Sequence, residues 1–161
     1  MERIFFNSSL NQSFTLTLKE VIKEIFEFIK EKPFYSYKLI IGTDSLNTLD
    51  HSDFVTAIII LRVGNGGRYF WRRIKDKNFK NLRERIYREV YLSLEIGQQL
   101  LKLLEKNKLY NFDLEIHVDV GQNGETRNLI NEVTGIVRGC GFTVKTKPES
   151  FAASHVADRC L

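Results

Sequence analysis

Two carboxylates follow apolar runs that are typical of buried strands. Asp44 stands within the run KLIIGTDSLN (38–47), and Asp119 stands near the end of DLEIHVDVG (113–121). If the two strands are parallel neighbours, their carboxyl ends meet at one edge of the sheet. Two carboxylates in contact repel each other and raise a pKa unless a cation lies between them. Because Mg²⁺ and Mn²⁺ prefer oxygen ligands, the pattern predicts a divalent-metal site.

A metal site that cleaves phosphodiester bonds needs further acids, and the long helix predicted at 81–106 offers three glutamates. Glu84 stands three residues after Asn81, which favours a structural capping box. At about 100° per residue, Glu89 lies nearest to the apolar stripe of this helix and Glu95 lies furthest from it. Only about 20° separates Glu89 from Glu84 by the same arithmetic. We choose Glu89 as the third acid.

The last predicted helix, at 150–161, carries His155 and Asp158, which are three residues apart and share one face. Asp158 lies near the C-terminal end of this helix, where the helix dipole disfavours an anion, and this makes it a candidate ligand. His155 is a candidate ligand, proton carrier or phosphate contact.

Each of these residues also has an ordinary structural interpretation. Asp44 alone is more often a turn residue, and Asp119 could simply end a strand. Glu89 could pair with Arg85, four residues before it on the helix. These alternatives stay open for each residue taken singly. The four acids together favour a site in which two ions, about 4 Å apart, serve phosphodiester cleavage.

The elements that must position these residues are predicted from apolar periodicity and turn signals. A helix is expected at about 16–32, and Pro33 stops it. β-Rich runs follow at 37–45, 54–63 and 68–75, and the pair Asn65-Gly66 predicts a hairpin between the last two. The helix at 81–106 comes next, then a strand at 113–121, a helix at 126–141, a strand at 142–148 and the last helix at 150–161. This order predicts an α/β domain with a mixed sheet covered on both faces.

Composition sets the broad class of the protein. The chain has 161 residues, of which 43% are hydrophobic, enough for one domain with a real core. The first residues lack the three regions of a signal peptide, and no apolar run approaches about 18 residues. We therefore expect a cytoplasmic protein without a membrane span. Cys140 and Cys160 do not form a C-x-x-C motif, so neither zinc nor a disulfide is predicted.

Positive charge is concentrated in one stretch of the chain. The formal net charge is +4, yet nine basic residues lie between Arg68 and Arg88. Such a stripe is typical of proteins that bind a polyanion, although a solvated basic face gives the same pattern. The residues that we predict to contact nucleic acid are Arg72, Arg73, Lys75, Lys80, Arg85 and Lys147.

Three segments resemble a known family. The runs IGTDS (41–45), HVDVGQNGETRNLINEVTGIVRGCGF (117–142) and KPESFAASHVADR (147–159) are similar to the bacterial ribonuclease H-like family typified by the YkuK protein. The resemblance covers about residue 36 to the C-terminus. It implies a ribonuclease H-like mixed five-stranded sheet flanked by helices, to which the N-terminal helix at about 16–32 is an addition. Together with the length of the chain, it predicts a single ribonuclease H-like domain over 1–161.

The resemblance further implies a metal-dependent nuclease architecture. Asp44, Glu89, Asp119 and Asp158 stand at the acidic positions of that superfamily, and His155-x-x-Asp158 is similar to the acidic final helix of Holliday-junction resolvases. The expected reaction is hydrolysis of RNA, an RNA–DNA hybrid or structured DNA with Mg²⁺ or Mn²⁺, two ions in all.

Two other functions compete with the nuclease. The fold could serve as a non-catalytic nucleic-acid-binding or assembly module, in which the acids are salt-bridge partners. GTDS (42–45) and DVGQNG (119–124) also resemble the phosphate loops of the actin and sugar-kinase superfold. Those phosphotransferases clamp a nucleotide between two such domains, and this chain supplies one.

Overall fold

The computed structural model describes residues 5–7, 15–105, 113–124 and 126–161. In this part of the chain the elements are β1 (Phe5–Asn7), β2 (Thr15–Leu16), α1 (Leu18–Glu31), β3 (Tyr37–Asn47), β4 (His51–Arg62), β5 (Gly67–Lys77), α2 (Leu82–Glu105), β6 (Leu114–His117), η1 (Arg127–Leu129), α3 (Ile130–Gly139), β7 (Thr143–Lys145), η2 (Ala152–Ala157) and η3 (Asp158–Cys160). Among these described helices, we find none with the length and apolar character that a membrane span requires.

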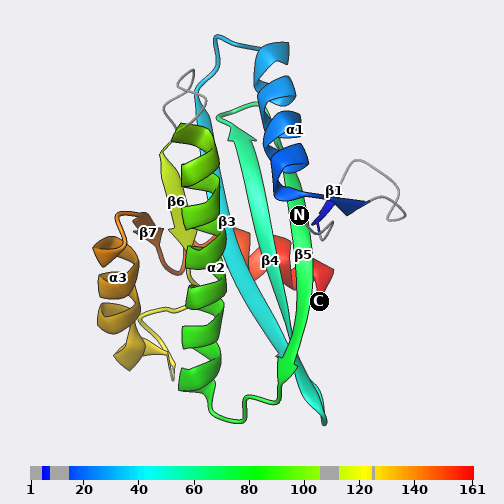
Figure 1. Cartoon of the computed structure of the whole chain (residues 1–161). Coiled ribbons are helices and arrows are strands. Elements are labelled where there is room, and N and C mark those ends of the chain that lie inside the picture. The colour runs from blue at the N-terminus through cyan, green and yellow to red at the C-terminus, as the bar shows by residue number, and fades with distance from the viewer. Residues whose placement is uncertain (1–4, 8–14, 106–112, 125) are drawn as a thin grey trace.

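The strands form one mixed sheet in the order β2-β1-β5-β4-β3-β6-β7 (Figure 1). β3, β4 and β5 pair antiparallel through long ladders, whereas β6 and β7 extend the other edge of β3 in parallel. The predicted α/β class with a mixed sheet is confirmed. Among the described residues the sheet has seven strands rather than the expected five. β1 and β2 are only three and two residues long, too short to give a periodic signal in the sequence.

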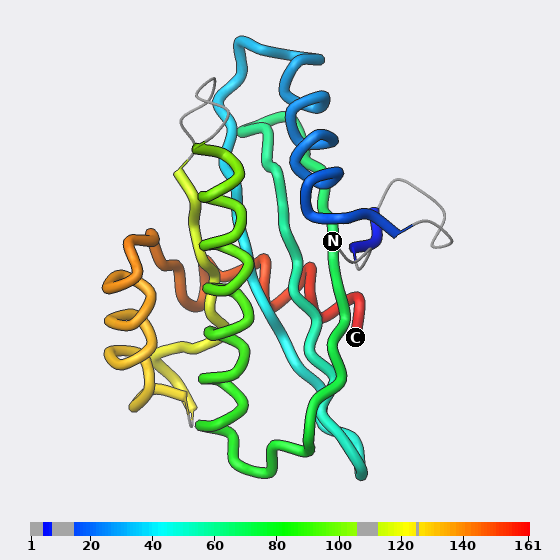
Figure 2. The backbone as a smooth tube through the Cα atoms, viewed as in Figure 1, coloured from blue at the N-terminus to red at the C-terminus, as the bar shows by residue number. Residues whose placement is uncertain are grey.

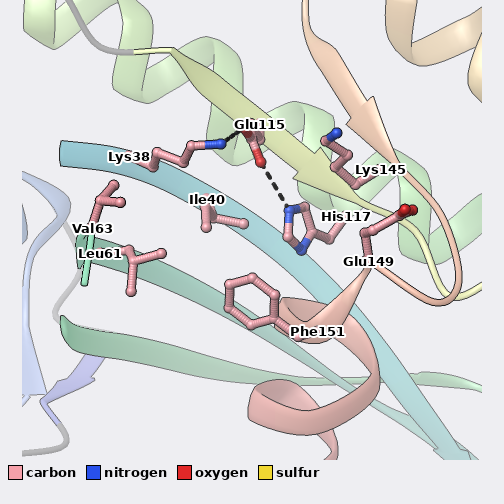
Figure 3. A pocket seen from close by; sticks show the side chains of 9 residues that line it. All are labelled: Lys38, Ile40, Leu61, Val63, Glu115, His117, Lys145, Glu149 and Phe151. Carbon is pink, nitrogen blue, oxygen red and sulfur yellow. Dashed lines mark hydrogen bonds and ion pairs between the residues drawn. The ribbon is translucent and has the colours of Figure 1, made fainter. Parts of the chain in front are cut away.

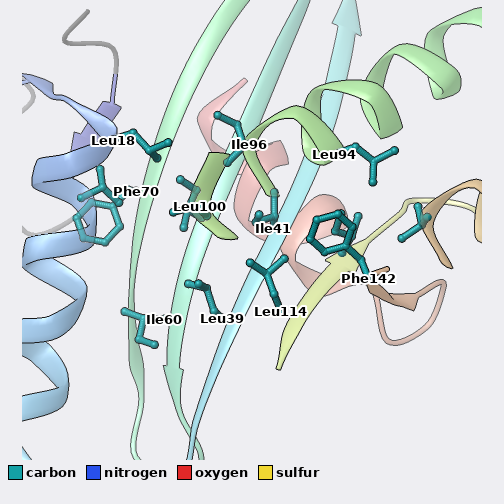
Figure 4. Packing of buried hydrophobic residues seen from close by; sticks show 14 of the residues in the cluster. Leu18, Leu39, Ile41, Ile60, Phe70, Leu94, Ile96, Leu100, Leu114 and Phe142 are labelled. Carbon is teal, nitrogen blue, oxygen red and sulfur yellow. The ribbon is translucent and has the colours of Figure 1, made fainter. Parts of the chain in front are cut away.

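Helices α1 and α2 cover one face of the sheet and bury the main hydrophobic core against it (Figures 1 and 4). α1 begins with a capping box, in which the Thr17 hydroxyl accepts from the N–H of Glu20 and the Glu20 carboxylate accepts from the N–H of Thr17. α2 begins after Asn81, whose side-chain oxygen accepts from the N–H of Arg83 at 2.8 Å. Leu39 and Ile41 of β3 belong to this core, and the Thr43 hydroxyl on the same strand lies 2.8 Å from the Ser93 hydroxyl of α2. The odd-numbered positions of β3 therefore face α2.

The opposite face of the sheet is covered by the last residues of the chain, 151–160, which we call the final helix. In Figure 2 this segment (red) crosses behind β3, β4 and β5. Its alanines Ala152, Ala153 and Ala157 are all 0% exposed. At Gly42 of β3 the two backbones come together, because a Cβ on Gly42 would lie 2.5 Å from the backbone nitrogen of Ala153. Only glycine permits this approach.

The final helix is not the α-helix that the sequence predicts. Residues Ala152–Ala157 form a π-helix, and Asp158–Cys160 continue as a 3₁₀ turn. In a π-helix the hydrogen bonds join residues five apart, so Ala152 and Ala157 lie on the same side. Both alanines pack on the sheet, Ala152 with Ile40 and Ala157 with Val55. The wider turn thus lets two alanines, five residues apart, contact the sheet together.

Replacement of Gly42 should test this contact. We expect Gly42→Ala to lower the free energy of unfolding by about 1–3 kcal/mol or more, because the new methyl group overlaps backbone atoms that cannot rotate away. Urea denaturation measures the change. Gly135→Ala in α3 is the matched control, since nothing lies within 4 Å of its added Cβ, and it should be neutral or slightly stabilising. Equal stability of both variants would contradict the close approach.

Candidate metal centre and nucleic-acid interface

Asp44 and Asp119 lie where the parallel pair β3–β6 separates. The last paired residues are Gly42 of β3 and His117 of β6; Asp44 follows two residues later on β3, and Asp119 follows two residues after the end of β6. β3 continues beyond Gly42 to Asn47 in its pairing with β4. Neighbouring strands are about 4.8 Å apart, so the two carboxylates leave the pair at the same level. Gly42 contacts the final helix, and Asp44, two residues on, faces the same side of the sheet.

The raised pKa of Asp44 reflects its burial and the charged residues around it. Burial is the main reason that the pKa of Asp44 is raised to about 6, and the charges of Asp119 and Asp158 raise it further. The N–H of Ser45 donates to Asp44 Oδ1 at 2.8 Å and opposes the rise in pKa, as does the guanidinium of Arg85. The structure therefore brings three of the predicted acids within electrostatic reach of one another.

Glu89 joins this group from helix α2. Its side chain is buried, with 6% exposed, and this burial is the main reason that its pKa is raised to about 8. The hydroxyl of Ser45 donates to Glu89 Oε1 and lowers the pKa, whereas the charges of Asp44 and Asp119 raise it. Arg85, one helical turn earlier, lowers it. Glu89 thus lies within electrostatic reach of the two aspartates, at the junction between α2 and the sheet.

The other glutamates of α2 lie elsewhere. Glu84 is exposed in the first turn of the helix. Glu95 pairs with Arg72 on β5, with 2.9 Å between Glu95 Oε2 and Arg72 Nη2. Of the three candidates that the sequence offered, Glu89 is the one that the structure places beside Asp44.

The two carboxylate oxygens of Asp119 have different surroundings. Its Oδ2 lies 3.0 Å from the ammonium Nζ of Lys147. Its Oδ1 is buried and has no hydrogen-bond partner among the described residues. Such an orphaned acceptor is costly unless a ligand satisfies it. One oxygen of Asp119 is therefore neutralised by the protein, and the other is left for a ligand.

The two predicted residues of the final helix differ in their surroundings. Asp158 is exposed, yet it is close enough to Asp44 to raise the pKa of that carboxyl. His155 is exposed, and its Nδ1 lies 2.8 Å from the hydroxyl of Ser154. We find no contact between His155 and the carboxylates in the described part of the chain. The structure therefore brings Asp158 to the acids and leaves His155 at the surface.

The acids fit a hard divalent cation by their chemistry. All four donors are carboxylates, their mutual repulsion calls for a cation, and Asp119 offers an unsatisfied oxygen. Within the described residues, no three His, Cys, Asp or Glu side chains are already arranged to hold an ion. Ser45 binds Glu89 and Asp44, and Lys147 binds Asp119. The donors would therefore have to exchange these contacts for the metal.

The predicted basic contacts divide between two faces of the sheet. Arg72 is buried, with 6% exposed, and its charge is matched by Glu95 and lies over the ring of Phe5. It points to the helix-covered face and is not available to a polyanion. Arg73 and Lys75 point to the other face, because side chains alternate along β5. Arg73 lies level with Asp44, since both pair with Val55 of β4.

Arg73, Lys80 and Arg85 each have a distinct environment. Arg73 also donates to the carbonyl oxygens of Cys160 and Leu161, which ties the end of the final helix to β5. Lys80 is exposed in the turn before α2. Arg85 is half-buried beside Asp44 and Glu89, and its Nε is buried without a hydrogen-bond partner among the described residues.

Sequence reasoning missed Ser45 and the partnership of Lys147 with Asp119. Ser45 follows Asp44 directly, so strand alternation turns it to the opposite face, where α2 lies. That alternation was the available signal. For Lys147 the sequence held no signal for its partner, because the contact joins segments that only the sheet brings together.

A cavity of about 400 Å³ lies on the same face of the sheet as Asp44 but apart from the acids (Figure 3). It is lined by Lys38, Ile40, Leu61, Val63, Glu115, His117, Lys145, Glu149 and Phe151. Ile40 precedes Asp44 by four residues, which is about 13 Å along the strand. At its edge the Glu115 carboxylate bridges Lys38 and His117, while His117 Nδ1 accepts from the N–H of Ala152. These contacts fix the start of the final helix.

Comparison with known proteins places the chain in a family. Residues 20–161 match the family model described as "Ribonuclease H-like". The chain belongs to the ribonuclease H-like family. It is 32% identical over 170 residues to the "Uncharacterized protein YkuK" of Bacillus subtilis (strain 168), an alignment that covers 97% of this chain and 95% of the relative. The resemblance seen in the sequence is thereby confirmed.

A solved structure of a ribonuclease H-like protein also matches. It is the crystal structure of RNase H1 from the halophilic archaeon Halobacterium salinarum NRC-1, with a TM-score of 0.42 and 14% sequence identity. The match covers 76% of this chain and 96% of that chain.

The buried carboxyl of Glu89 predicts how the stability of the metal-free protein depends on pH. Its pKa is about 8 in the folded state, above its ordinary value of 4.5, so folding favours the protonated form. The resulting stabilisation is complete at low pH and is lost as the pH rises through about 8. We expect the free energy of unfolding in EDTA to fall between about pH 5 and about pH 8. Glu89→Gln should remove most of this fall, because glutamine stays neutral.

Urea denaturation at several pH values measures this effect. Glu84→Gln, in the same helix but exposed, is the matched control and should keep the wild-type pH dependence. Parallel curves for wild type and Glu89→Gln would show that Glu89 is not buried as a neutral acid.

Proposed function

We propose that this protein is a divalent-metal-dependent nuclease that hydrolyses phosphodiester bonds of RNA, an RNA–DNA hybrid or structured DNA. The observation that carries the proposal is the convergence of Asp44, Glu89 and Asp119, from two strands and one helix, where β3 and β6 separate. The crevice beyond the carboxyl ends of parallel strands is where open α/β sheets bind their ligands. Membership of the ribonuclease H-like family agrees with this position.

The carboxylates would hold the ion or ions. Asp44, Glu89 and Asp119 are the main ligands in this proposal, and Asp158 approaches from the final helix. When bound, Mg²⁺ or Mn²⁺ lowers the pKa of a coordinated water and stabilises charge on the phosphoryl oxygens. Ser45 orients Glu89 by its hydrogen bond, and the buried setting of Glu89 keeps bulk water away from this side. His155 remains a candidate phosphate contact at the surface.

The substrate backbone would be held by charge. Arg85 suits the reacting phosphate, because it is half-buried beside the acids and its Nε has no partner among the described residues. Arg73 and Lys75 lie on the same face of the sheet as Asp44, and Lys80 is exposed before α2. Phosphate contacts of this kind bind with little sequence preference. We accordingly propose nucleic acid as the partner without choosing among its forms.

One observation favours a second candidate function, a non-catalytic nucleic-acid-binding or assembly module. Lys147 already forms an ion pair with Asp119, and Ser45 already donates to Glu89. If these contacts are permanent, the acids are structural and the basic residues alone bind the nucleic acid. The two candidates differ in one measurable property, which is cleavage that depends on Asp44.

Substitution of the strand aspartates tests the proposal. With Mn²⁺ and labelled single-stranded, hybrid and junction substrates, we expect Asp44→Asn and Asp119→Asn to lower the cleavage rate at least about a hundredfold. Asp44→Asn removes a buried charge that is repelled by two others, so the fold should not lose stability. Binding measured by fluorescence anisotropy should be retained. Asp50→Asn, at an exposed turn, is the matched control and should cleave normally.

The outcomes separate the two candidates. Cleavage by both variants at the wild-type rate would overturn the assignment of these acids. Binding without cleavage by the wild-type protein, with every substrate and with Mg²⁺ or Mn²⁺ present, would favour the non-catalytic module.

A further inference from the structure

We propose that Lys147 takes the place of one of the two divalent ions, so that the carboxylate site binds a single Mg²⁺ or Mn²⁺. This inference rests on the proposed function and concerns the same site. It departs from the two-ion arrangement that the four acids suggest when they are considered without their neighbours.

The first support is the way in which Lys147 is held. Its backbone N–H donates to the carbonyl of Val120 at 2.9 Å, which fixes the residue beside the segment that follows β6. Its aliphatic stem lies against Gly121, where an added Cβ would be 3.2 Å from Lys147 Cβ and 3.4 Å from Cδ. A larger residue at position 121 would push the lysine away. Lys147 is thus directed to Asp119 by its backbone and by its stem.

The second support is the division of the two oxygens of Asp119. Oδ2 contacts the Lys147 ammonium at 3.0 Å, a distance typical of a charge-assisted hydrogen bond. Oδ1 is buried without a partner among the described residues. A carboxylate between two ions gives one oxygen to each. Asp119 here gives one oxygen to the ammonium and has one left for an ion.

The third support is the charge of the site. When ionised, Asp44, Glu89, Asp119 and Asp158 carry four negative charges. Lys147 and Arg85 return two positive charges, because both lie beside these acids. Before substrate binds, one divalent ion makes this group of charges neutral, whereas two ions would leave an excess of positive charge. In a site that excludes water on one side, an unbalanced charge is costly.

The two basic side chains, Lys147 and Arg85, therefore have different roles. Lys147 is engaged with Asp119 and acts as a built-in counter-ion. Arg85 lies beside the acids, yet its Nε has no hydrogen-bond partner within the described residues, so this nitrogen is available to a phosphate of the substrate. Loss of Lys147 should change how many ions bind, whereas loss of Arg85 should change how tightly the substrate binds.

The number of bound ions tests the inference without any measurement of activity. In calorimetric titrations with Mn²⁺ we expect one ion per chain for the wild-type protein and two for Lys147→Met. Electron paramagnetic resonance should show spin coupling between neighbouring Mn²⁺ ions in Lys147→Met and none in the wild type. Lys147→Arg keeps the charge and should bind one ion. Lys145→Met, which removes a lysine two residues away on β7 that forms no ion pair within the described residues, is the matched control and should also bind one.

The possible results distinguish failure of this inference from failure of the proposed function. Two ions in the wild-type protein, or one ion in a folded Lys147→Met variant, would overturn the role of Lys147 while leaving a metal-dependent nuclease in place. Absence of Mn²⁺ binding in every folded variant would overturn both the inference and the proposed function. Circular dichroism establishes folding, and Lys147→Arg provides a variant with the positive charge retained.

Discussion

The structure depends on the contact between the backbone of β3 and the final helix at Gly42. A Cβ at this position would lie 2.5 Å from the nitrogen of Ala153, so the helix rests on the sheet with no side chain between them. The buried alanines of the helix complete this contact. Because the chain then runs across β3, β4 and β5, Asp158 comes within electrostatic reach of Asp44, and Arg73 can bind the last carbonyl groups. The approach that seals one face of the sheet thus also brings the fourth acid to the site.

Mutual repulsion of the acids is the second constraint. Asp44 and Glu89 have raised pKa values chiefly because they are buried, and their acidic neighbours add to the effect. Three contacts oppose this repulsion. The backbone N–H of Ser45 donates to Asp44, the hydroxyl of Ser45 donates to Glu89, and the ammonium of Lys147 pairs with Asp119. Acids that are brought this close together favour binding of a cation, because a cation reduces their mutual repulsion. The same feature that costs stability without metal would provide affinity with it.

Much of the fold follows from local patterns. The Asn65-Gly66 turn, the cap at Asn81 and the apolar, β-rich run of β3 predict elements that the structure contains. The short strands β1 and β2 were missed, because two or three residues have no measurable period. Arg72 was misplaced on the nucleic-acid surface for a related reason. Phe70 and Trp71 are both apolar, so the sequence does not say which face of β5 is buried, and Arg72 shares the buried face with Phe70.

The sequence by itself indicated which acids could meet, because Asp44 and Asp119 belong to apolar runs typical of buried strands, although β3 continues past Asp44 to Asn47 and β6 ends at His117, before Asp119. It also indicated the family. Only the tertiary structure decided which glutamate joins them, since about 20° of helix rotation separates Glu84 from Glu89 and packing sets that rotation. It alone paired Lys147 with Asp119 and Ser45 with Glu89. Strand ends and helix faces are local properties, whereas the partner of a charged group depends on segments that are distant in the chain and adjacent in the fold.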